Sequence, residues 1–151
     1  MKLAEALQER ADLNRKIEEL NVRLKNNCLM QEGKKPEEDP DKLLQELDGC
    51  IQRLHILIAG INKINCETKI DGKTLTEMIA EKDCLNIKLS SYKAIINEAS
   101  QKAKRAAYTE IKILSSIQVS KLQDEVDKIS KQIRLLDNKL QECNWNTTFL
   151  E

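Results

Sequence analysis

The chain has 151 residues, 25 of them basic and 25 acidic, so its formal net charge is zero. Zero net charge removes the strongest sequence argument for nucleic acid or an anionic membrane as a partner. Leu, Ile and Val number 39 while Gly and Pro number six, so aliphatic residues are abundant and helix breakers are rare. This composition predicts a single all-α domain over residues 1–151, an antiparallel bundle of long helices with coiled-coil packing.

The first predicted helix covers about residues 2–30 and is followed by a polar linker that contains Gly33 and two prolines. Its apolar residues are spaced three and four apart, as in a coiled coil, with polar interruptions at Arg10 and Asn27. The Arg10 side chain either extends to solvent from the edge of the bundle or pairs with a carboxylate across an interface. Arg10 is therefore a candidate interface residue.

The second predicted helix covers about residues 41–66 and carries a wide apolar stripe. A stripe of this width predicts more than one neighbouring helix. Gly49 and Gly60 lie within the helix and cost about 1 kcal/mol each relative to Ala, a cost that close backbone approach would offset. Both glycines therefore predict crowding around this helix. The apolar positions are Leu43, Leu44, Leu47, Cys50, Ile51, Leu54, Ile56, Leu57, Ile58, Ile61 and Ile64.

The Asp71-Gly72 pair is a strong turn signal, and its neighbours favour a small β-hairpin. Thr74 and Glu77 fit a capping box, which places the start of the third helix at residue 75. This helix is predicted over residues 75–107 and has two apolar stripes, so it needs two partners. One stripe is Leu75, Ile79, Leu85, Leu89, Tyr92, Ile96 and Ala99, and the other is Ala80, Cys84, Ile87 and Ile95.

Residues 108–113 alternate and predict a short strand before the fourth helix. The fourth helix, over about residues 119–143, has the cleanest apolar seam in the chain, without a charged member. Trp145 and Phe149 follow it in the C-terminal tail. An exposed aromatic tail is unfavourable in water, so both are candidate interface residues that dock on the bundle or on a neighbouring subunit.

The sequence contains no catalytic or metal-binding constellation. His55 is the single histidine, and the residue three before it is Gln52 rather than the glutamate of a di-iron bundle. The five cysteines lack paired spacing, so we expect free thiols. The acidic residues 37–41 either hold a hard cation weakly or form a solvated linker whose Asp41 starts the second helix. We expect no enzymatic activity, no metal and no cofactor.

A local basic patch precedes the fourth helix and fits either phosphate contact or a solvated helix end. Its members are Lys102, Lys104, Arg105 and Lys112. The longest apolar stretch, residues 54–61, is much shorter than the roughly 20 residues of a membrane span. The first residues are acidic where a signal peptide has its apolar core. We therefore expect a soluble, cytoplasmic protein.

Nine short stretches carry a resemblance that extends over nearly the whole chain: residues 1–7, 9–13, 26–27, 31–33, 38–40, 71–76, 110–112, 136–137 and 144–145. In them the chain resembles a family of small bacterial helical proteins labelled septicolysin. The resemblance implies an all-helical protein that assembles into a homo-oligomer, with a hexamer as one suggested form. It implies no established activity and no catalytic residues.

Four functions are open at this stage, and the last of them is an enzyme whose polar pocket is assembled between subunits and is invisible from one chain. The preferred one is a non-enzymatic helical protein that self-associates, because the Leu and Ile rows exceed what one four-helix packet can bury. The family label instead implies a pore-forming cytolysin, although no spanning helix or sustained strand pair is present. A nucleic-acid-binding accessory protein using the basic patch is the third. A polar cavity at a subunit boundary would be sought first around Asn26, Asn27, Asn62 and Asn65.

Overall fold

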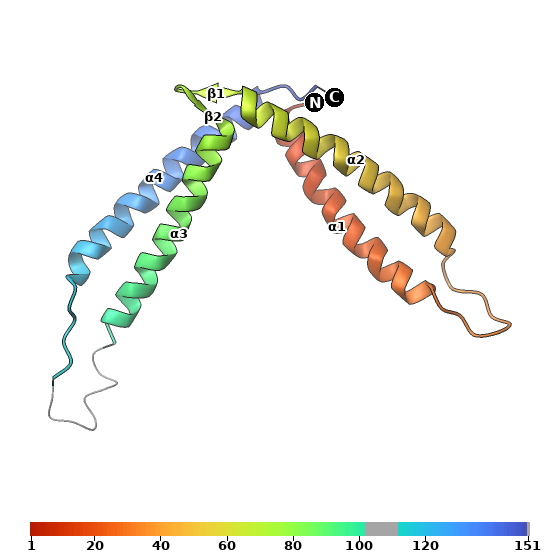
Figure 1. Cartoon of the computed structure of the whole chain (residues 1–151), viewed down its shortest axis with the longest axis horizontal. Coiled ribbons are helices and arrows are strands. Elements are labelled where there is room, and N and C mark those ends of the chain that lie inside the picture. Colours follow the sequence, from red (N-terminus) through yellow and green to blue (C-terminus); the bar gives the residue numbers. More distant parts are fainter. Residues whose placement is uncertain (102–111, 151) are drawn as a thin grey trace. The chain divides into compact units, whose positions relative to one another are not determined.

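The computed structural model describes residues 1–101 and 112–150, which form four long helices and one small β-hairpin (Figure 1). The chain divides into two compact units, one of residues 1–70 with the C-terminal residues from 141, the other of residues 71–140. The all-α fold class with a small hairpin is confirmed, and the single domain stays a prediction. The elements are α1 (Leu3–Asn27), α2 (Pro40–Glu67), β1 (Lys69–Ile70), β2 (Lys73–Thr74), α3 (Leu75–Ala99) and α4 (Val119–Asn146).

The helices begin at the N-terminal signals of the sequence. Asp39 accepts a hydrogen bond from the Asp41 N–H at 3.0 Å and Pro40 occupies the first turn, so Asp39 rather than Asp41 starts α2. At α3, Thr74 Oγ1 accepts from the Glu77 N–H at 3.2 Å, and Glu77 Oε2 accepts from the Thr74 N–H at 2.7 Å. This reciprocal capping box confirms the predicted start of α3.

The predicted hairpin at Asp71-Gly72 is confirmed. The φ angles are +51° at Asp71 and +84° at Gly72, and a type I′ turn requires positive φ at both central positions. Glycine adopts this conformation without steric cost and Asp tolerates it. Lys139 Nζ of α4 also pairs with Asp71 Oδ2 at 2.8 Å. The turn therefore depends on the backbone preferences of Asp71 and Gly72, and the ion pair with Lys139 connects it to α4.

The end of α1 corrects the prediction. The helix ends at Asn27 rather than near residue 30, and the next apolar side chains, Leu29 and Met30, are 86% and 70% exposed. Extending α1 over these residues would bury little apolar surface. Tertiary packing supplies most of the stability of a helix, so extending α1 beyond Asn27 would gain little stability.

The end of α3 and the predicted strand also differ from expectation. α3 ends at Ala99, where Ser100 Oγ donates to the Ile96 carbonyl at 2.7 Å. Residues 102–107 of the predicted helix lie outside the described residues. So do residues 108–111 of the predicted strand, while Lys112 and Ile113 belong to no strand.

α4 begins at Val119 as predicted and continues three residues past the predicted end, to Asn146. The Thr147 N–H donates to the Cys143 carbonyl at 2.9 Å, which carries the helical hydrogen-bond ladder through the last turn. The predicted seam is the inner face of the helix. Its members are all buried or half-buried: Val119, Leu122, Val126, Ile129, Ile133, Leu136, Leu140 and Cys143.

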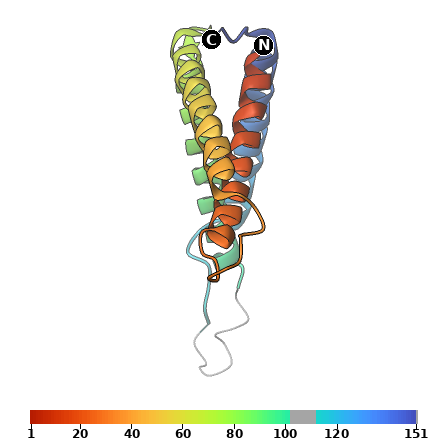
Figure 2. The same ribbon diagram turned by 90° about the vertical axis from the view of Figure 1, so that its right-hand side faces the viewer.

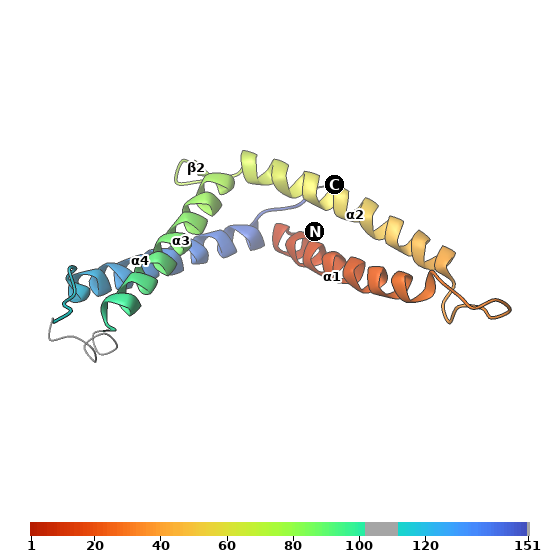
Figure 3. The same cartoon turned by 60° about the horizontal axis from the view of Figure 1, so that its bottom comes forward.

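In the first unit, α1 and α2 run antiparallel and pack along their length (Figures 1 and 3). Leu20 of α1 and Leu43 and Cys50 of α2 are buried together in their shared core. The predicted stripe of α1 is confirmed, since all its members are buried or half-buried: Leu3, Ala6, Arg10, Leu13, Ile17, Leu20, Leu24 and Asn27.

In the second unit, α3 and α4 also run antiparallel (Figures 1 and 3). Lys82 of α3 pairs with Asp137 of α4. On α3 the buried positions near the start are Leu75 and Met78, while Ile79 of the predicted stripe is exposed. The members of the second predicted stripe are exposed within the described residues: Ala80, Cys84, Ile87 and Ile95.

The C-terminal tail returns to the N-terminal end of α1 (Figure 2). The Leu3 N–H donates to the Thr147 carbonyl at 2.9 Å, and the Phe149 N–H donates to the Met1 carbonyl at 2.8 Å. Phe149 is 2% exposed and lies against Gly60 of α2. A Cβ atom at Gly60 would lie 2.6 Å from the Phe149 ring, so the predicted close approach at this glycine is confirmed.

The corresponding expectation for Gly49 is wrong. No atom lies within 4 Å of the place where its Cβ would stand. The position faces open space on the outer side of α2, so nothing in the described structure requires glycine there.

The two glycines give a matched prediction. Gly60→Ala should lower the free energy of unfolding by about 1–3 kcal/mol, because the added methyl overpacks the Phe149 ring. Gly49→Ala should raise it by about 0.5–1 kcal/mol through helix propensity alone. Urea unfolding followed by circular dichroism measures both. Stabilisation by Gly60→Ala would contradict the packing of Phe149 on Gly60.

Candidate functional site

One edge of the α1–α2 hairpin is closed by charged pairs. In the described part of the chain, three ion pairs join α1 to α2 or to the short segment just before it. Their α1 members are spaced seven residues apart, so they lie in one row beside the apolar seam. The pairs are Glu9–Arg53, Lys16–Glu46 and Arg23–Glu38. We call this row the charged edge.

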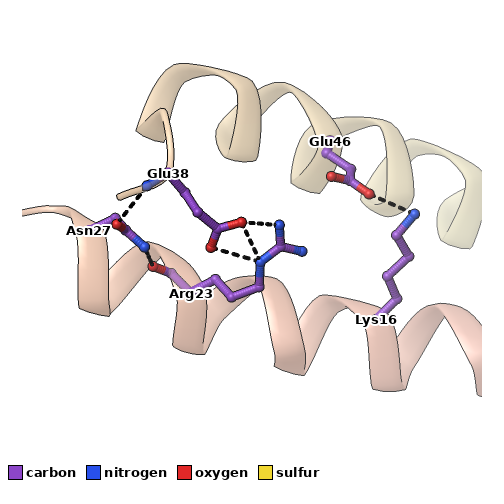
Figure 4. A network of polar contacts seen from close by, with 5 residues as sticks. All are labelled: Lys16, Arg23, Asn27, Glu38 and Glu46. Carbon is purple, nitrogen blue, oxygen red and sulfur yellow. Dashed lines mark hydrogen bonds and ion pairs between the residues drawn. The ribbon is translucent and has the colours of Figure 1, made fainter. Parts of the chain in front are cut away.

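The geometry of the charged edge is that of charge-assisted hydrogen bonds. Arg53 donates to both carboxylate oxygens of Glu9, from Nε at 2.7 Å and from Nη2 at 2.9 Å. Arg23 Nε lies 3.1 and 3.0 Å from the two oxygens of Glu38 (Figure 4). The bidentate pairs fix the register of α1 against α2 more than they stabilise it, because exposed ion pairs contribute little.

These contacts displace the pKa values of the carboxyl groups. The guanidinium of Arg53 lowers the pKa of Glu9 by hydrogen bonding. Arg23 lowers the pKa of Glu38 in the same way, and the Lys16 ammonium lowers that of Glu46. The carboxylates of the charged edge therefore stay ionised below the ordinary glutamate range.

Asn27 holds the end of the hairpin (Figure 4). Its Nδ2 donates to the Arg23 carbonyl at 2.8 Å, and its Oδ1 accepts from the Glu38 N–H at 3.0 Å. The side chain is 8% exposed. One amide thus adds a second hydrogen bond to a carbonyl near the end of α1 and supplies the partner of the Glu38 N–H, which lies just before α2 and outside both helices. These two hydrogen bonds explain why a polar residue, Asn27, occupies a position of the apolar seam.

A shallow hollow lies beside this end of the hairpin, with a volume of about 670 Å³. It contains no catalytic group arrangement. Glu38, from the acidic residues 37–41, is engaged by Arg23, and Asp39 caps α2, so the solvated-linker interpretation fits better than a cation site. The lining residues are Asn27, Cys28, Leu29, Met30, Lys35, Pro36, Glu37, Asp39 and Pro40.

The opposite edge of the α1–α2 hairpin has no charge. The row on the other side of the seam also repeats every seven residues, and none of its members is ionisable apart from the thiol that ends it. On α2, its members Leu44, Ile51 and Ile58 are 46%, 47% and 41% exposed. We call this row the uncharged edge: Leu7, Asn14, Asn21 and Cys28 from α1, and Leu44, Ile51, Ile58 and Asn65 from α2.

Arg10 is half-buried in the α1 seam. Within the described residues it forms neither an ion pair nor a hydrogen bond, in contrast to Glu9 beside it. Both hypotheses for this side chain, solvent exposure from the edge and pairing across an interface, therefore stay open.

The two aromatic candidates of the tail have different surroundings. Phe149 is buried by its own chain, which is the first of the two predicted alternatives, docking on the bundle rather than on a neighbouring subunit. Trp145, at the end of α4, is 50% exposed and stays a candidate. The tail therefore docks within the chain through one ring and leaves the other half-accessible.

The four asparagines that were to mark a cavity do not come together. Asn26 and Asn27 lie at the end of α1, opposite the start of α2, whereas Asn62 and Asn65 lie near the end of α2. The 22 residues from Pro40 to Asn62 span roughly 33 Å of helix. Asn27 alone among them has the structural role described above.

The remaining candidate residues lie outside the charged edge. His55 is exposed on α2, and none of the five cysteines forms a disulfide. No group of three or more His, Cys, Asp or Glu side chains able to hold a metal ion occurs among the described residues. No helix in residues 1–101 and 112–150 has the length and apolar character needed to cross a membrane. Of the basic patch, only Lys112 falls within the described residues.

The seams alone do not predict that the hairpin has two different edges, although the sequence carries the signal. That signal lies in the rows on either side of the α1 and α2 seams. Once the helices are known to be antiparallel partners, rows on the same side face each other, and one edge is charged while the other is not.

Residues 10–149 match the family of unknown function DUF6847. The chain belongs to this family. A solved structure with the same fold is the crystal structure of a functionally unknown conserved protein from Corynebacterium diphtheriae, with 31% sequence identity and a TM-score of 0.93, covering 99% of each chain. No curated protein matches significantly. The resemblance to septicolysin-labelled proteins stays a prediction.

The Asn27 contacts lead to a prediction with an adjacent control. Asn27→Ala should destabilise the chain by about 1–3 kcal/mol, because the Glu38 N–H loses its hydrogen-bond partner. Asn26→Ala replaces an exposed neighbour in the same helical turn and should be close to neutral or slightly stabilising. Chemical unfolding compares the two, and equal effects would exclude a special role for Asn27.

The charged edge predicts loss of stability in acid. A carboxylate with a lowered folded-state pKa contributes stability above its unfolded pKa and loses it as the pH falls through the folded value. The melting temperature should therefore fall as the pH drops below about 4. A triple glutamine variant at Glu9, Glu38 and Glu46 should lose less stability between neutral and acid pH than Glu18→Gln on the outer face. An equal loss in both would contradict the prediction.

Proposed function

We propose that the protein is a non-enzymatic helical protein that assembles with copies of itself through the uncharged edge. The observation that carries this proposal is the contrast between the two edges of one hairpin. The charged edge has its charges neutralised within the chain by Arg53, Lys16 and Arg23. The uncharged edge leaves Leu44, Ile51 and Ile58 nearly half-exposed.

The spacing of the exposed residues supports a helix as the partner. Leu44, Ile51 and Ile58 recur every seven residues, in continuity with the buried seam of the same helix. An apolar row of this period packs against another helix that has the same period, with the seam extended to a further member. A flat or irregular partner surface would not match it.

Charge complementarity supports a second copy of this chain as the partner. A two-fold interface brings the same surface of both copies together, so a charged surface meets like charges, whereas the uncharged edge meets none. The polar members Asn14 and Asn21 can donate and accept hydrogen bonds to their own kind. A nucleic acid or an anionic lipid surface would require a positive patch, and this edge offers none.

We also propose a cytoplasmic location. None of the five cysteines forms a disulfide, and three of them are exposed: Cys28, Cys66 and Cys84. Exposed thiols persist in a reducing compartment and are oxidised outside it. Fractionation of cells followed by detection of the protein would check the location.

Light scattering coupled to size-exclusion chromatography at micromolar concentrations tests the assembly. We expect the wild type to elute above its monomer mass of 17.3 kDa. Ile51→Lys combined with Ile58→Lys should shift the protein to the monomer, because it introduces like charges into the interface.

A matched control uses the outer face of the same helix. Gln45→Lys combined with Gln52→Lys adds the same two charges at exposed positions away from both edges. This variant should assemble like the wild type, and circular dichroism should show unchanged helicity in both variants. A monomeric wild type, or equal dissociation of both variants, would overturn the proposal.

A further inference from the structure

His55 borders the uncharged edge at its centre. Ile51 lies four residues before it and Ile58 three residues after it, so the three side chains are neighbours on one surface of α2. The histidine is exposed, and it is the single histidine of the chain. A helix that covers Ile51 and Ile58 would therefore also remove water from His55.

We propose that protonation of His55 opposes self-association through the uncharged edge, so that assembly is favoured at neutral pH and weakened in mild acid. This inference rests on the proposed function. Histidine is the side chain that changes charge between about pH 5 and 8 in its ordinary state. Removing a charged imidazolium from water without a partner is costly, whereas the neutral ring is accommodated in an apolar border.

The surroundings of His55 offer no compensating charge close to it. On α2, Asp48 is seven residues away, roughly 10 Å along the helix, and Arg53 is engaged by Glu9 on the charged edge. The Glu9–Arg53 pair places Leu7 at the level of His55 on α1, with Arg10 about one turn further along. Arg10 is itself a cation, so it supplies no compensating charge.

Other nearby members of α1 are uncharged, namely Ala11 and Asn14. In a two-fold assembly the His55 rings of both copies border the same interface, so their protonation adds like charges on both sides. Assembly should therefore respond to two protonation events. Each histidine that must remain neutral weakens association about tenfold when the pH is one unit below its midpoint.

The charged edge does not interfere with this response. The hydrogen bonds to Arg53, Arg23 and Lys16 lower the pKa values of their glutamate partners. These carboxylates therefore stay ionised throughout the range in which histidine titrates.

Sedimentation velocity over a concentration series, at about pH 7.5 and about pH 5.5 with constant ionic strength, tests the inference. For the wild type, the apparent dissociation constant should be at least about tenfold higher at the lower pH. His55→Gln should assemble equally at both values. The double variant His55→Gln with Gln52→His moves the histidine to the outer face and should also assemble equally at both.

The outcomes separate the two proposals. A wild type that is monomeric at about pH 7.5 overturns the proposed function and this inference with it. A wild type that assembles equally at both pH values overturns the inference alone. Persistence of the pH response in His55→Gln would also overturn it, because another group would then be responsible.

Discussion

Antiparallel packing of α1 against α2 decides where the other side chains of the hairpin lie. Both helices follow a seven-residue repeat, so burying one seam on each places a row of side chains on either side of it. One row is filled by acids and bases that neutralise each other across the hairpin, from Glu9–Arg53 to Arg23–Glu38. The other row has no ionised member and remains half-exposed. The separation of the hairpin surface into a charged and an uncharged edge thus follows from which residues the two helices bury between them.

The ends of the hairpin are fixed by specific contacts that the repeat does not supply. Asn27 satisfies backbone groups of the loop end with its single amide. At the other end, Phe149 fills the space that the absent side chain of Gly60 leaves, and the tail pairs with the first residues of the chain. These contacts resist fraying where helices are weakest, because terminal N–H and carbonyl groups lack intrahelical partners.

The proposed self-association concerns a surface of the α1–α2 hairpin rather than a cleft. The described residues contain neither a metal-binding cluster nor a catalytic arrangement around His55. What distinguishes the first unit is an uncharged row of regular spacing beside a neutralised one. Such a surface suits recognition of another helix with the same repeat, and His55 at its border would make that recognition responsive to proton concentration.

The sequence alone determined the helical class, the turn at Asp71-Gly72 and the capped start of α3, because each depends on contacts within a few residues. It also revealed the seams of α1 and α4, since a buried face imposes its period on the chain. Only the tertiary structure decided the end of α1, the burial of Phe149 on Gly60, the open surroundings of Gly49 and the separation of the four asparagines. These depend on which residues meet across large sequence distances, and no local pattern specifies such pairs. The uncharged edge needed both sources of information. The sequence shows each row of uncharged residues, but only the pairing of α1 with α2 shows that the two rows lie on the same side of the hairpin.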